Sequence, residues 1–373
     1  MELNKRLKVL FICSWYPSRE HRTIGNFIQR HALAVAKYHD ITVVYATESH
    51  ENNIEVVENG GLIEHLIYFK KTIPALSYQK SIRSHIKKLQ KEQNFDIAHI
   101  HVAYPAILAV PILKMPYIIT EHFSGYHKIS GFQWGAIKKK LSIKYLNKAK
   151  AILPVSNHLA KAIQEFAVRN KFIKISNVVD IDSFYPREKK SEIFRFLHVS
   201  SLEERSKNIS GILKGFKELY DLGFDFILQI GGDGDLDELK KKITDVGLKE
   251  DCLEIFGESS AEQISEMMRK AHCLVMFSHF ENQPCTILEA LCSGIPVISS
   301  NVGGISEEIN EENGILVPSG DMPQFVQSLK AMVQNYSDFD LKSIAQIARN
   351  KYSNDSIAKE ISAVYFNVLN IDS

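Results

Sequence analysis

Residues 278–304 read SHFENQPCTILEALCSGIPVISSNVGG, and this stretch decides the fold of the chain. The pattern predicts a loop, a short helix, a buried strand and a second loop, with polar residues gathered at the junctions. Pro284 suits the first helical position, and Gly294 suits the position just past the helix end. The apolar run from Pro296 to Ser299 predicts the buried strand.

Two glutamates of this stretch, Glu281 and Glu289, have seven residues between them. They should lie on the order of 10 Å apart, which suits a ligand held at both ends better than a proton-sharing pair. The free N–H groups within residues 283–286, where Pro284 itself has none, favour an anionic or hydroxyl-rich ligand, and Gly303 and Gly304 let the second loop approach it closely. The alternative is a solvated Glu281 and a helix-surface Glu289.

The same residues carry a family resemblance. Glu281 and Glu289 in this spacing, followed by Ala290, Gly294 to Val297 and the Gly303-Gly304 pair, resemble the donor-site signature of the family 4 retaining glycosyltransferases with the GT-B fold. The fold class implied is α/β, with two facing Rossmann-like domains that have parallel sheets and a deep interdomain cleft.

The resemblance also implies a division of labour along the chain. Residues 1–185 would form an N-terminal domain that binds the acceptor, and residues 186–355 a C-terminal domain that binds the nucleotide sugar. Residues 356–373 would form a helix that packs back on the first domain. The polar segment at 187–192 predicts a linker.

Composition agrees with two domains. The chain has 373 residues, of which 45% are hydrophobic, enough for two large cores. Its five cysteines are odd in number and scattered, so we expect a reducing cytoplasm rather than a disulfide framework or a zinc site. No stretch reaches eighteen apolar residues, and the N-terminus predicts a strand rather than a signal peptide.

The net charge of +1 hides an asymmetry. Residues 1–190 contain 29 Lys and Arg against 15 Asp and Glu, whereas residues 191–373 contain 16 against 29. A basic half joined to an acidic half favours a membrane-facing domain carried by a water-facing one. Ordinary compositional scatter is the alternative.

The first half alternates short β-rich runs with helical patterns, which predicts a parallel sheet covered by helices on both faces. Ligands of such sheets bind at the carboxyl ends of the strands. The predicted strands are Ile41 to Tyr45, Ile63 to Tyr68, Asp96 to His99, Tyr117 to Thr120, Ile152 to Val155 and Ile173 to Ser176.

Polar residues follow these strand ends. Gly25 stands where the first loop turns into a helix from about Asn26, so its amide could face a phosphate. His99 and His101 form a His-x-His pair, for which loop contacts are favoured because no third metal ligand is evident. His122 resembles the family histidine that contacts the donor sugar or its acceptor near the reacting carbon, and a hydrogen-bonded strand-end histidine is the alternative.

The second half opens with a strand at Arg195 to Ser200, followed by a loop and a helix. Lys207 resembles the lysine that neutralises the donor diphosphate, and Arg205 could assist it. The chain departs from the family here, because Ser200 and Ser201 stand where many relatives have Gly-Arg. The predicted site comprises His122 and Glu281 as catalytic residues and Gly25, Ser201, Arg205, Lys207, Asn208, Gly257, Asn282, Gln283, Pro284, Cys285, Thr286 and Glu289 as donor-binding residues, with no metal ligand.

Two motifs resemble other sites and are set aside. The glycine-rich segment at 231–234 lacks the third glycine of a dinucleotide fingerprint, since Asp237 stands there, which argues against a dinucleotide-dependent oxidoreductase. Asp233, Asp235 and Asp237 resemble the start of a calcium loop, but Glu238 occupies the place of its turn glycine.

Residues 135–150, GAIKKKLSIKYLNKAK, predict a basic helix, with Ile129, Phe132 and Trp134 just before it. Such a helix could lie against anionic lipid. A solvated helix face is the alternative, and a nucleic-acid partner is not expected because no recognition motif accompanies the lysines.

The family resemblance implies a retaining hexosyltransferase of polysaccharide biosynthesis, and the composition and charge pattern agree with it. It would move a sugar from a UDP- or GDP-linked donor to a hydroxyl of a glycan or lipid-linked glycan, with no metal and no cofactor. It would be cytoplasmic and peripheral at the inner face of the membrane. The alternatives are a GT-B-fold sugar-nucleotide epimerase, a glycogen-synthase-like enzyme and a non-catalytic sugar-nucleotide-binding protein.

Overall fold

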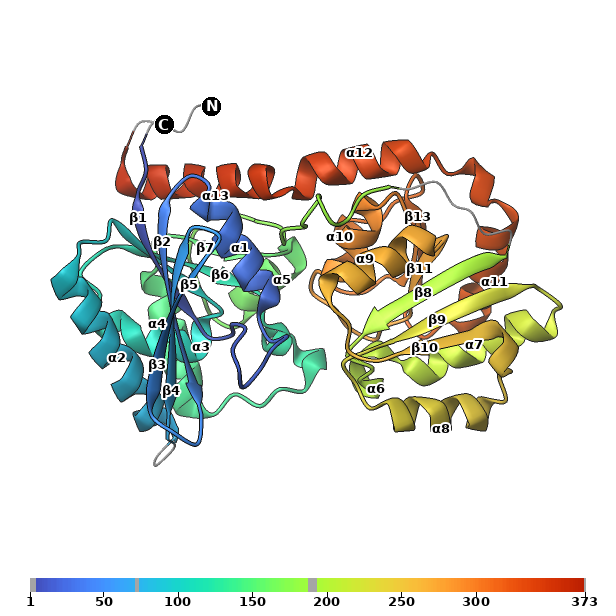
Figure 1. Cartoon of the computed structure of the whole chain (residues 1–373), viewed down its shortest axis with the longest axis horizontal. Helices are drawn as coiled ribbons and strands as arrows, with labels where there is room; N and C mark the ends of the chain where they lie inside the picture. The colour runs from blue at the N-terminus through green and yellow to red at the C-terminus, as the bar shows by residue number, and fades with distance from the viewer. Residues whose placement is uncertain (1–4, 71–73, 187–192, 372–373) are drawn as a thin grey trace. The chain divides into compact units, whose positions relative to one another are not determined.

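The computed structural model describes residues 5–70, 74–186 and 193–371 (Figure 1). The predicted linker at 187–192 lies outside the described residues. The chain divides into two compact units: unit 1 contains Met1–Val178 and Asn354–Ser373, and unit 2 contains Val179–Ser353. Each unit is an α/β domain built on its own sheet, so the predicted pair of parallel-sheet domains is confirmed.

The division between the units falls after Val178, seven residues before the predicted boundary at 185. The reason is that the following segment is held by the last helix of unit 2. Val179 N–H donates to the carbonyl of Tyr352 at 2.9 Å. Arg349 Nη1 donates to the carbonyls of Ile181 at 2.7 Å and Phe184 at 2.9 Å.

The sheet of unit 1 has the strand order β3-β4-β2-β1-β5-β6-β7. All neighbours are parallel except β3 and β4. Alternate residues of β1 enter two cores, with Leu10 and Ile12 on one face and Val9 and Phe11 on the other. The elements are β1 (Lys8–Cys13), α1 (Asn26–Ala36), β2 (Asp40–Glu48), β3 (Asn53–Asn59), β4 (Leu62–Phe69), α2 (Pro74–Glu92), β5 (Ile97–His101), α3 (Ala103–Ala106), β6 (Tyr117–Glu121), α4 (Ala136–Lys148), β7 (Ile152–Pro154), α5 (Asn157–Glu165) and α13 (Asn354–Leu369).

The C-terminal helix α13 belongs to unit 1, where it packs against α1 (Figure 1). Its buried residues include Ile357, Ile361 and Val364, which share the core on that face of the sheet. The apolar stripe read from the sequence therefore serves the first domain.

Two features of the sheet differ from the sequence prediction. The strand expected at 173–176 is wrong: Ile173 and Ile175 donate to carbonyls of Ile152 and Pro154, but the pairing of this segment with β7 amounts to an isolated bridge between Ile152 and Phe172. β3 was missed because it is an exposed edge strand with no apolar run. The turn at Gly60-Gly61, where φ is +55° and +87°, is the signal that could have predicted the hairpin.

A cluster of four histidines occupies the core of unit 1. His99 and His101 lie 4.1 Å apart between ring centroids, and His31 lies 5.8 Å from His101 and 5.6 Å from His122. Burial lowers the pKa of His31 to about 4 and the pKa of the other three well below the ordinary value. The cluster is therefore neutral near pH 7.

The sheet of unit 2 has the strand order β10-β9-β8-β11-β12-β13, and all its pairs are parallel. The chain leaves β8 toward β9 on one side and returns to β11 on the other, which makes β8 and β11 the switch point of the sheet. The elements are β8 (Phe194–Ser200), α6 (Glu204–Lys207), α7 (Ile209–Asp221), β9 (Phe226–Gly232), α8 (Leu236–Val246), β10 (Leu253–Phe256), α9 (Ala261–Lys270), β11 (Cys273–Met276), α10 (Cys285–Cys292), β12 (Val297–Ser300), β13 (Gly314–Val317), α11 (Met322–Gln334) and α12 (Leu341–Tyr352).

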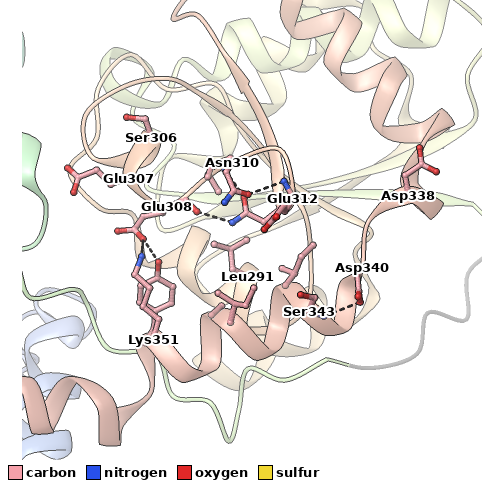
Figure 2. Close-up of a pocket in the computed structure, with 16 residues that line it drawn as sticks. Leu291, Ser306, Glu307, Glu308, Asn310, Glu312, Asp338, Asp340, Ser343 and Lys351 are labelled. Atoms are coloured by element: carbon pink, nitrogen blue, oxygen red, sulfur yellow. Dashed lines mark hydrogen bonds and ion pairs between the residues drawn. The ribbon is translucent and has the colours of Figure 1, made fainter.

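One buried carboxylate ties three segments of unit 2 together. Glu308 has a side chain that is 1% exposed, and Lys351 Nζ lies 2.6 Å from its Oε2 (Figure 2). Gln283 Nε2 donates to Glu308 Oε1 at 2.7 Å, and the Tyr352 hydroxyl also donates to the carboxylate. The loop before α10 is thereby held to the end of α12.

Replacing Glu308 should destabilise unit 2. In Glu308→Ala the Gln283 amide and the Tyr352 hydroxyl stay buried without their acceptor, which should cost on the order of 2 to 4 kcal/mol. Thermal unfolding should show a midpoint several degrees lower. The control is Glu311→Ala, an exposed glutamate in the same loop, and an equal effect of both variants would contradict the role of the network.

Unit 1 should lose stability in acid. The unfolded chain binds protons at histidines near pH 6.5 whereas the buried cluster does not, so stability is complete above about pH 7 and falls as the pH drops toward about 4. Both tryptophans, Trp15 and Trp134, lie in unit 1. Urea unfolding followed by tryptophan fluorescence should therefore report this loss without interference from unit 2.

A matched pair of variants tests the cause. His101→Leu removes one of the buried rings and should make the pH dependence shallower, by up to about 1.4 kcal/mol per pH unit for each proton no longer taken up on unfolding. The same change at the exposed His50 should leave the slope as in the wild type. Identical slopes in all three proteins would show that the cluster does not control acid stability.

Candidate functional site

Two loops meet at the switch point of unit 2. The first loop, residues 201–208, follows the carboxyl end of β8 and includes the single turn of α6. The second loop, residues 277–284, follows the carboxyl end of β11. In open parallel sheets this is the place where ligands bind. Most of the predicted donor-binding residues lie on these two loops, because the motifs that carry them follow β8 and β11 directly.

The first loop is fixed to both strands by a chain of hydrogen bonds. Leu202 N–H donates to Ser200 Oγ at 3.1 Å, and Ser200 Oγ lies 2.8 Å from His198 Nε2. His198 Nδ1 lies 2.8 Å from the carbonyl of Val275 in β11. Since a carbonyl can only accept, Nδ1 carries the proton and Nε2 accepts from Ser200. Burial, and secondarily the charge of Lys207, lowers the pKa of His198 to about 4, so this arrangement persists at neutral pH.

Direct contacts join the two loops. Asn208 is the N-cap of α7, with φ at +53°, and its Oδ1 accepts from Gly211 N–H at 3.2 Å. Its Nδ2 donates to the carbonyl of Phe277 at 3.1 Å. His279 N–H donates to the carbonyl of Ser206 at 2.8 Å. Asn208 therefore both caps a helix and positions the loop after β11.

The centre of the arrangement is an ion pair between Lys207 and Glu281, with Nζ 2.5 Å from Oε1. Their side chains are 18% and 10% exposed, and Ser278 Oγ donates to the same Oε1 at 3.0 Å. The alternative of a solvated Glu281 is therefore wrong. The structure brings together the residue predicted to hold the diphosphate and the residue predicted to hold the sugar.

Glycines allow neighbouring backbone segments to pack closely against the two loops that carry Lys207 and Glu281. A Cβ at Gly232 would lie 1.7 Å from the Ser200 carbonyl oxygen, and one at Gly234 would lie 2.3 Å from that of Ser201. A Cβ at Gly303, where φ is +59°, would lie 1.7 Å from the Glu281 carbonyl oxygen. The close approach at Gly303 is thus to the chain's own backbone.

Helix α10 carries the second glutamate. It begins at Cys285, with Pro284 as its N-cap residue, and Gly294 follows its end with φ at +69°. Glu289 is buried, with 4% exposure, so the alternative of a helix-surface carboxylate is wrong. Thr286 Oγ1 lies 3.6 Å from the Met276 sulfur, which directs this hydroxyl toward β11.

Several predicted residues lie at the margin of the switch point. Ser201 and Arg205 are exposed on the first loop. Asn282 and Gln283 are buried. Gly304 N–H donates to the Asn282 carbonyl, and Gln283 Nε2 donates to Glu308, so both residues are bonded to other parts of unit 2. Cys285 is half-buried. Gly257 follows β10, which is separated from β8 by β9, so it lies farther along the same edge of the sheet.

Gly25 and His122 belong to unit 1. Gly25 is the N-cap of α1 with φ at +76°, and a Cβ there would lie 2.6 Å from the Trp15 backbone. His122 is buried beside Phe27, with ring centroids 4.7 Å apart. Burial lowers the pKa of His122, and a hydrogen bond with Asn177 acts in the opposite direction. A neutral imidazole can exchange hydrogen bonds with a hydroxyl but supplies no charge.

Glu121, next to His122, is fully buried and satisfied by the protein. Its carboxylate accepts from the amides of Ala103, His122 and Phe123 at 2.9 to 3.0 Å and from the Tyr126 hydroxyl at 3.0 Å. It therefore shapes the turn that presents His122.

The side chains of the His-x-His pair, His99 and His101, contact other side chains of the protein core. His99 bonds the Tyr365 hydroxyl at 2.7 Å and Thr120 Oγ1 at 2.6 Å, and His101 stacks on Phe11 with ring centroids 4.6 Å apart. Within residues 5–70, 74–186 and 193–371, no group of three or more His, Cys, Asp or Glu is arranged to hold a metal ion.

Three residues of the arrangement in unit 2 were not predicted as site residues, namely His198, Ser278 and Glu308, and neither was Asn177, which contacts His122 in unit 1. Ser278 opens the stretch that decides the fold, three residues before Glu281, and a hydroxyl at that spacing is the one available signal. His198 lies in β8 directly before the first loop, but its bond to Val275 and the bond of Glu308 to Gln283 join segments distant in sequence, which local pattern does not reveal.

A separate cavity of about 570 Å³ lies between the loop after β12 and helix α12 (Figure 2). Its lining includes Leu291, Glu307, Glu312, Asp340 and Lys351. Glu308 is one of its lining residues and also accepts from Gln283 Nε2 in the loop before α10. Among the described residues, no helix has the length and apolar character needed to cross a membrane.

Comparison with known proteins agrees with this architecture. The model for glycosyl transferases group 1 matches residues 181–353, and the model for glycosyltransferase family 4 matches residues 24–183. The Escherichia coli UDP-Gal:alpha-D-GlcNAc-diphosphoundecaprenol alpha-1,3-galactosyltransferase is 26% identical over 356 residues, covering 85% of this chain and 88% of that protein. Other relatives are named for the biosynthesis of teichuronic acid, colanic acid and amylovoran.

Solved structures share the fold over nearly the whole chain. Sucrose-phosphate synthase from Thermosynechococcus elongatus superposes with a TM-score of 0.79 at 14% identity, covering 97% of this chain and 99% of that one. HepE of Anabaena, solved in complex with UDP-glucose, gives a TM-score of 0.75 at 15% identity, covering 97% and 100%. With both halves matched by the two models, the chain belongs to the family 4 glycosyltransferases, group 1, with the GT-B fold.

Proposed function

We propose that this glycosyltransferase moves a hexose from a UDP-linked donor to a hydroxyl of a lipid-linked glycan, with retention at the anomeric carbon and without a metal ion. The observation that carries the proposal is the Lys207–Glu281 ion pair at the switch point of the second sheet. One cation and one carboxylate are held there by two loops, in a place where charge is poorly screened by water.

The departing nucleotide diphosphate makes the largest electrostatic demand of the reaction. Lys207 and the first amides of α10 would stabilise the charge that develops on it. A diphosphate would compete with Glu281 for Lys207, and Glu281 would then turn its oxygens to hydroxyls of the sugar. Glu289 would accept from the ribose hydroxyls, and neutral His122 would contact the sugar.

The choice of donor and acceptor follows the relatives. The galactosyltransferase of Escherichia coli is named for a UDP-sugar donor and a diphosphoundecaprenol-linked acceptor, and HepE was solved with UDP-glucose. A lipid-linked acceptor requires work at a membrane surface. The excess of Lys and Arg in residues 1–190 supports peripheral association with an anionic membrane.

UDP should stabilise the protein through Lys207 and Glu289. In thermal-shift measurements with EDTA, UDP or a UDP-sugar at about 100 times its dissociation constant should add about 2.7 kcal/mol and raise the midpoint by several degrees. Lys207→Met and Glu289→Gln should each weaken UDP binding about tenfold to a hundredfold, because each removes a charged hydrogen-bond partner. The panel should also include GDP, ADP, their sugar conjugates and NAD.

A control variant tests whether the effect is specific to Lys207, and the other nucleotides test the choice of donor. Lys217→Met removes a lysine that also pairs with a carboxylate, Asp221, but on an exposed face of α7, and it should bind UDP as the wild type does. A shift with GDP alone would reassign the base. A shift with NAD alone, or with UDP only after a metal is added, would overturn the proposal.

Glu281 should separate binding from transfer. In Glu281→Gln the competition for Lys207 is weakened, so UDP should bind at least as tightly as in the wild type while kcat for transfer falls at least about a hundredfold. A tenfold loss of UDP affinity with unchanged kcat would contradict this role. NMR of the wild-type product tests retention, since the new bond must keep the anomeric configuration of the donor.

A further inference from the structure

We propose that one surface of unit 1 docks on an anionic lipid bilayer. The docking surface consists of Lys128, Ile129, Phe132, Ile137, Lys138, Lys139, Lys140 and Lys144, on the segment before α4 and on its first three turns. This inference deepens the proposed function, because it names the surface on which a lipid-linked acceptor would be met.

The apolar part of the docking surface is unusually exposed. Ile137 is 77% exposed and Ile129 is 65% exposed, and these are the two most exposed large apolar side chains of the described residues. Phe132 is 46% exposed. Three apolar side chains this exposed within nine residues are a candidate for insertion, whereas single exposed apolar residues are normal.

Neighbouring aromatic side chains hold the ring of Phe132 in place. One side of the Phe132 ring packs edge-on against Phe123 at 4.9 Å and Trp134 at 5.4 Å between centroids. Trp134 Nε1 donates to the Gly125 carbonyl at 2.8 Å, and its ring packs on Phe166 at 4.6 Å. The exposure is therefore a property of the folded surface, and the core beneath it is already filled.

The surrounding charge has a single sign. Residues 122–164 contain eight lysines and no aspartate or glutamate. On the docking surface, Lys138, Lys139 and Lys140 are consecutive and exposed. Each lysine at an anionic bilayer adds to the attraction, and the lysine stems can lie along the headgroups while their ammonium groups stay hydrated.

The mixture of lysines and apolar side chains favours a lipid bilayer over other polyanionic partners. A nucleic acid or a polyanionic glycan would engage the lysines but leave Ile129 and Ile137 in contact with water. A bilayer takes both, since acyl chains accept the apolar side chains and anionic headgroups accept the lysines. Another exposed apolar group among the described residues, Ile54 and Val56 on β3, stands near Glu51, Glu55 and Glu58, of which Glu51 and Glu55 pair with Arg19. It therefore lacks the excess of positive charge that an anionic surface attracts.

Flotation with vesicles tests the proposal. The full chain should float with vesicles of phosphatidylcholine mixed with phosphatidylglycerol at low salt, less at high salt, and not with phosphatidylcholine alone. Ile137→Asp should weaken binding at least about tenfold. The triple variant Lys138→Gln, Lys139→Gln, Lys140→Gln should weaken it on the order of a hundredfold.

The matched control is Val56→Asp, which makes the same charge change at a side chain that is 59% exposed, and it should float like the wild type. Wild-type protein that stays unbound, or equal losses in Ile137→Asp and Val56→Asp, would overturn the proposal. Binding to a single-stranded oligonucleotide without binding to vesicles would also overturn it and assign the lysines to a polyanion.

Failure here is distinguishable from failure of the proposed function. Flotation needs neither donor nor acceptor, and the UDP-induced thermal shift of Ile137→Asp should equal that of the wild type. A chain that floats but shows no UDP shift would refute the transfer proposal alone. A chain that binds UDP but never floats would refute the docking surface alone.

Discussion

The ion pair between Lys207 and Glu281 is the constraint on which the second domain depends. Two opposite charges with little exposure lose much of their hydration, and their attraction repays this only if the geometry is exact and further hydrogen bonds complete it. Ser278 supplies one such bond to Glu281. The contacts from Asn208 and His279 then hold the two loops at the required distance.

This requirement explains several residues that otherwise look unrelated. The glycines at 232, 234 and 303 leave room for the backbone of Ser200, Ser201 and Glu281. His198 can remain buried between β8 and β11 because it is neutral and bonded at both ring nitrogens. Glu308 fixes the segment before α10 from behind, through Gln283. The sheet's switch point supplies the location, and these side chains supply the rigidity.

The first domain handles charge in the opposite way. Its core contains four neutral histidines and the buried carboxylate of Glu121, which is satisfied by amides and a tyrosine. Its positive charge lies instead on exposed lysines, above all those of α4. Lysine thus has two roles in this chain: Lys207 is a paired, partly buried cation, and the lysines of α4 form a hydrated field beside exposed isoleucines.

The sequence by itself determined the family, the two α/β domains and the positions of Lys207, Glu281 and Glu289, because glycine, proline and apolar periodicity act locally and mark loops at strand ends. It failed at β3, whose exposed residues carry no apolar run, and at the expected strand 173–176, where the chain forms only an isolated bridge, between Phe172 and Ile152 of β7. Only the tertiary structure decided that Lys207 contacts Glu281, that Glu289 is buried and that Glu308 reaches Gln283. These contacts join residues 25 to 74 positions apart in sequence, and local pattern cannot specify which side chains meet when strands far apart in the chain become neighbours in a sheet.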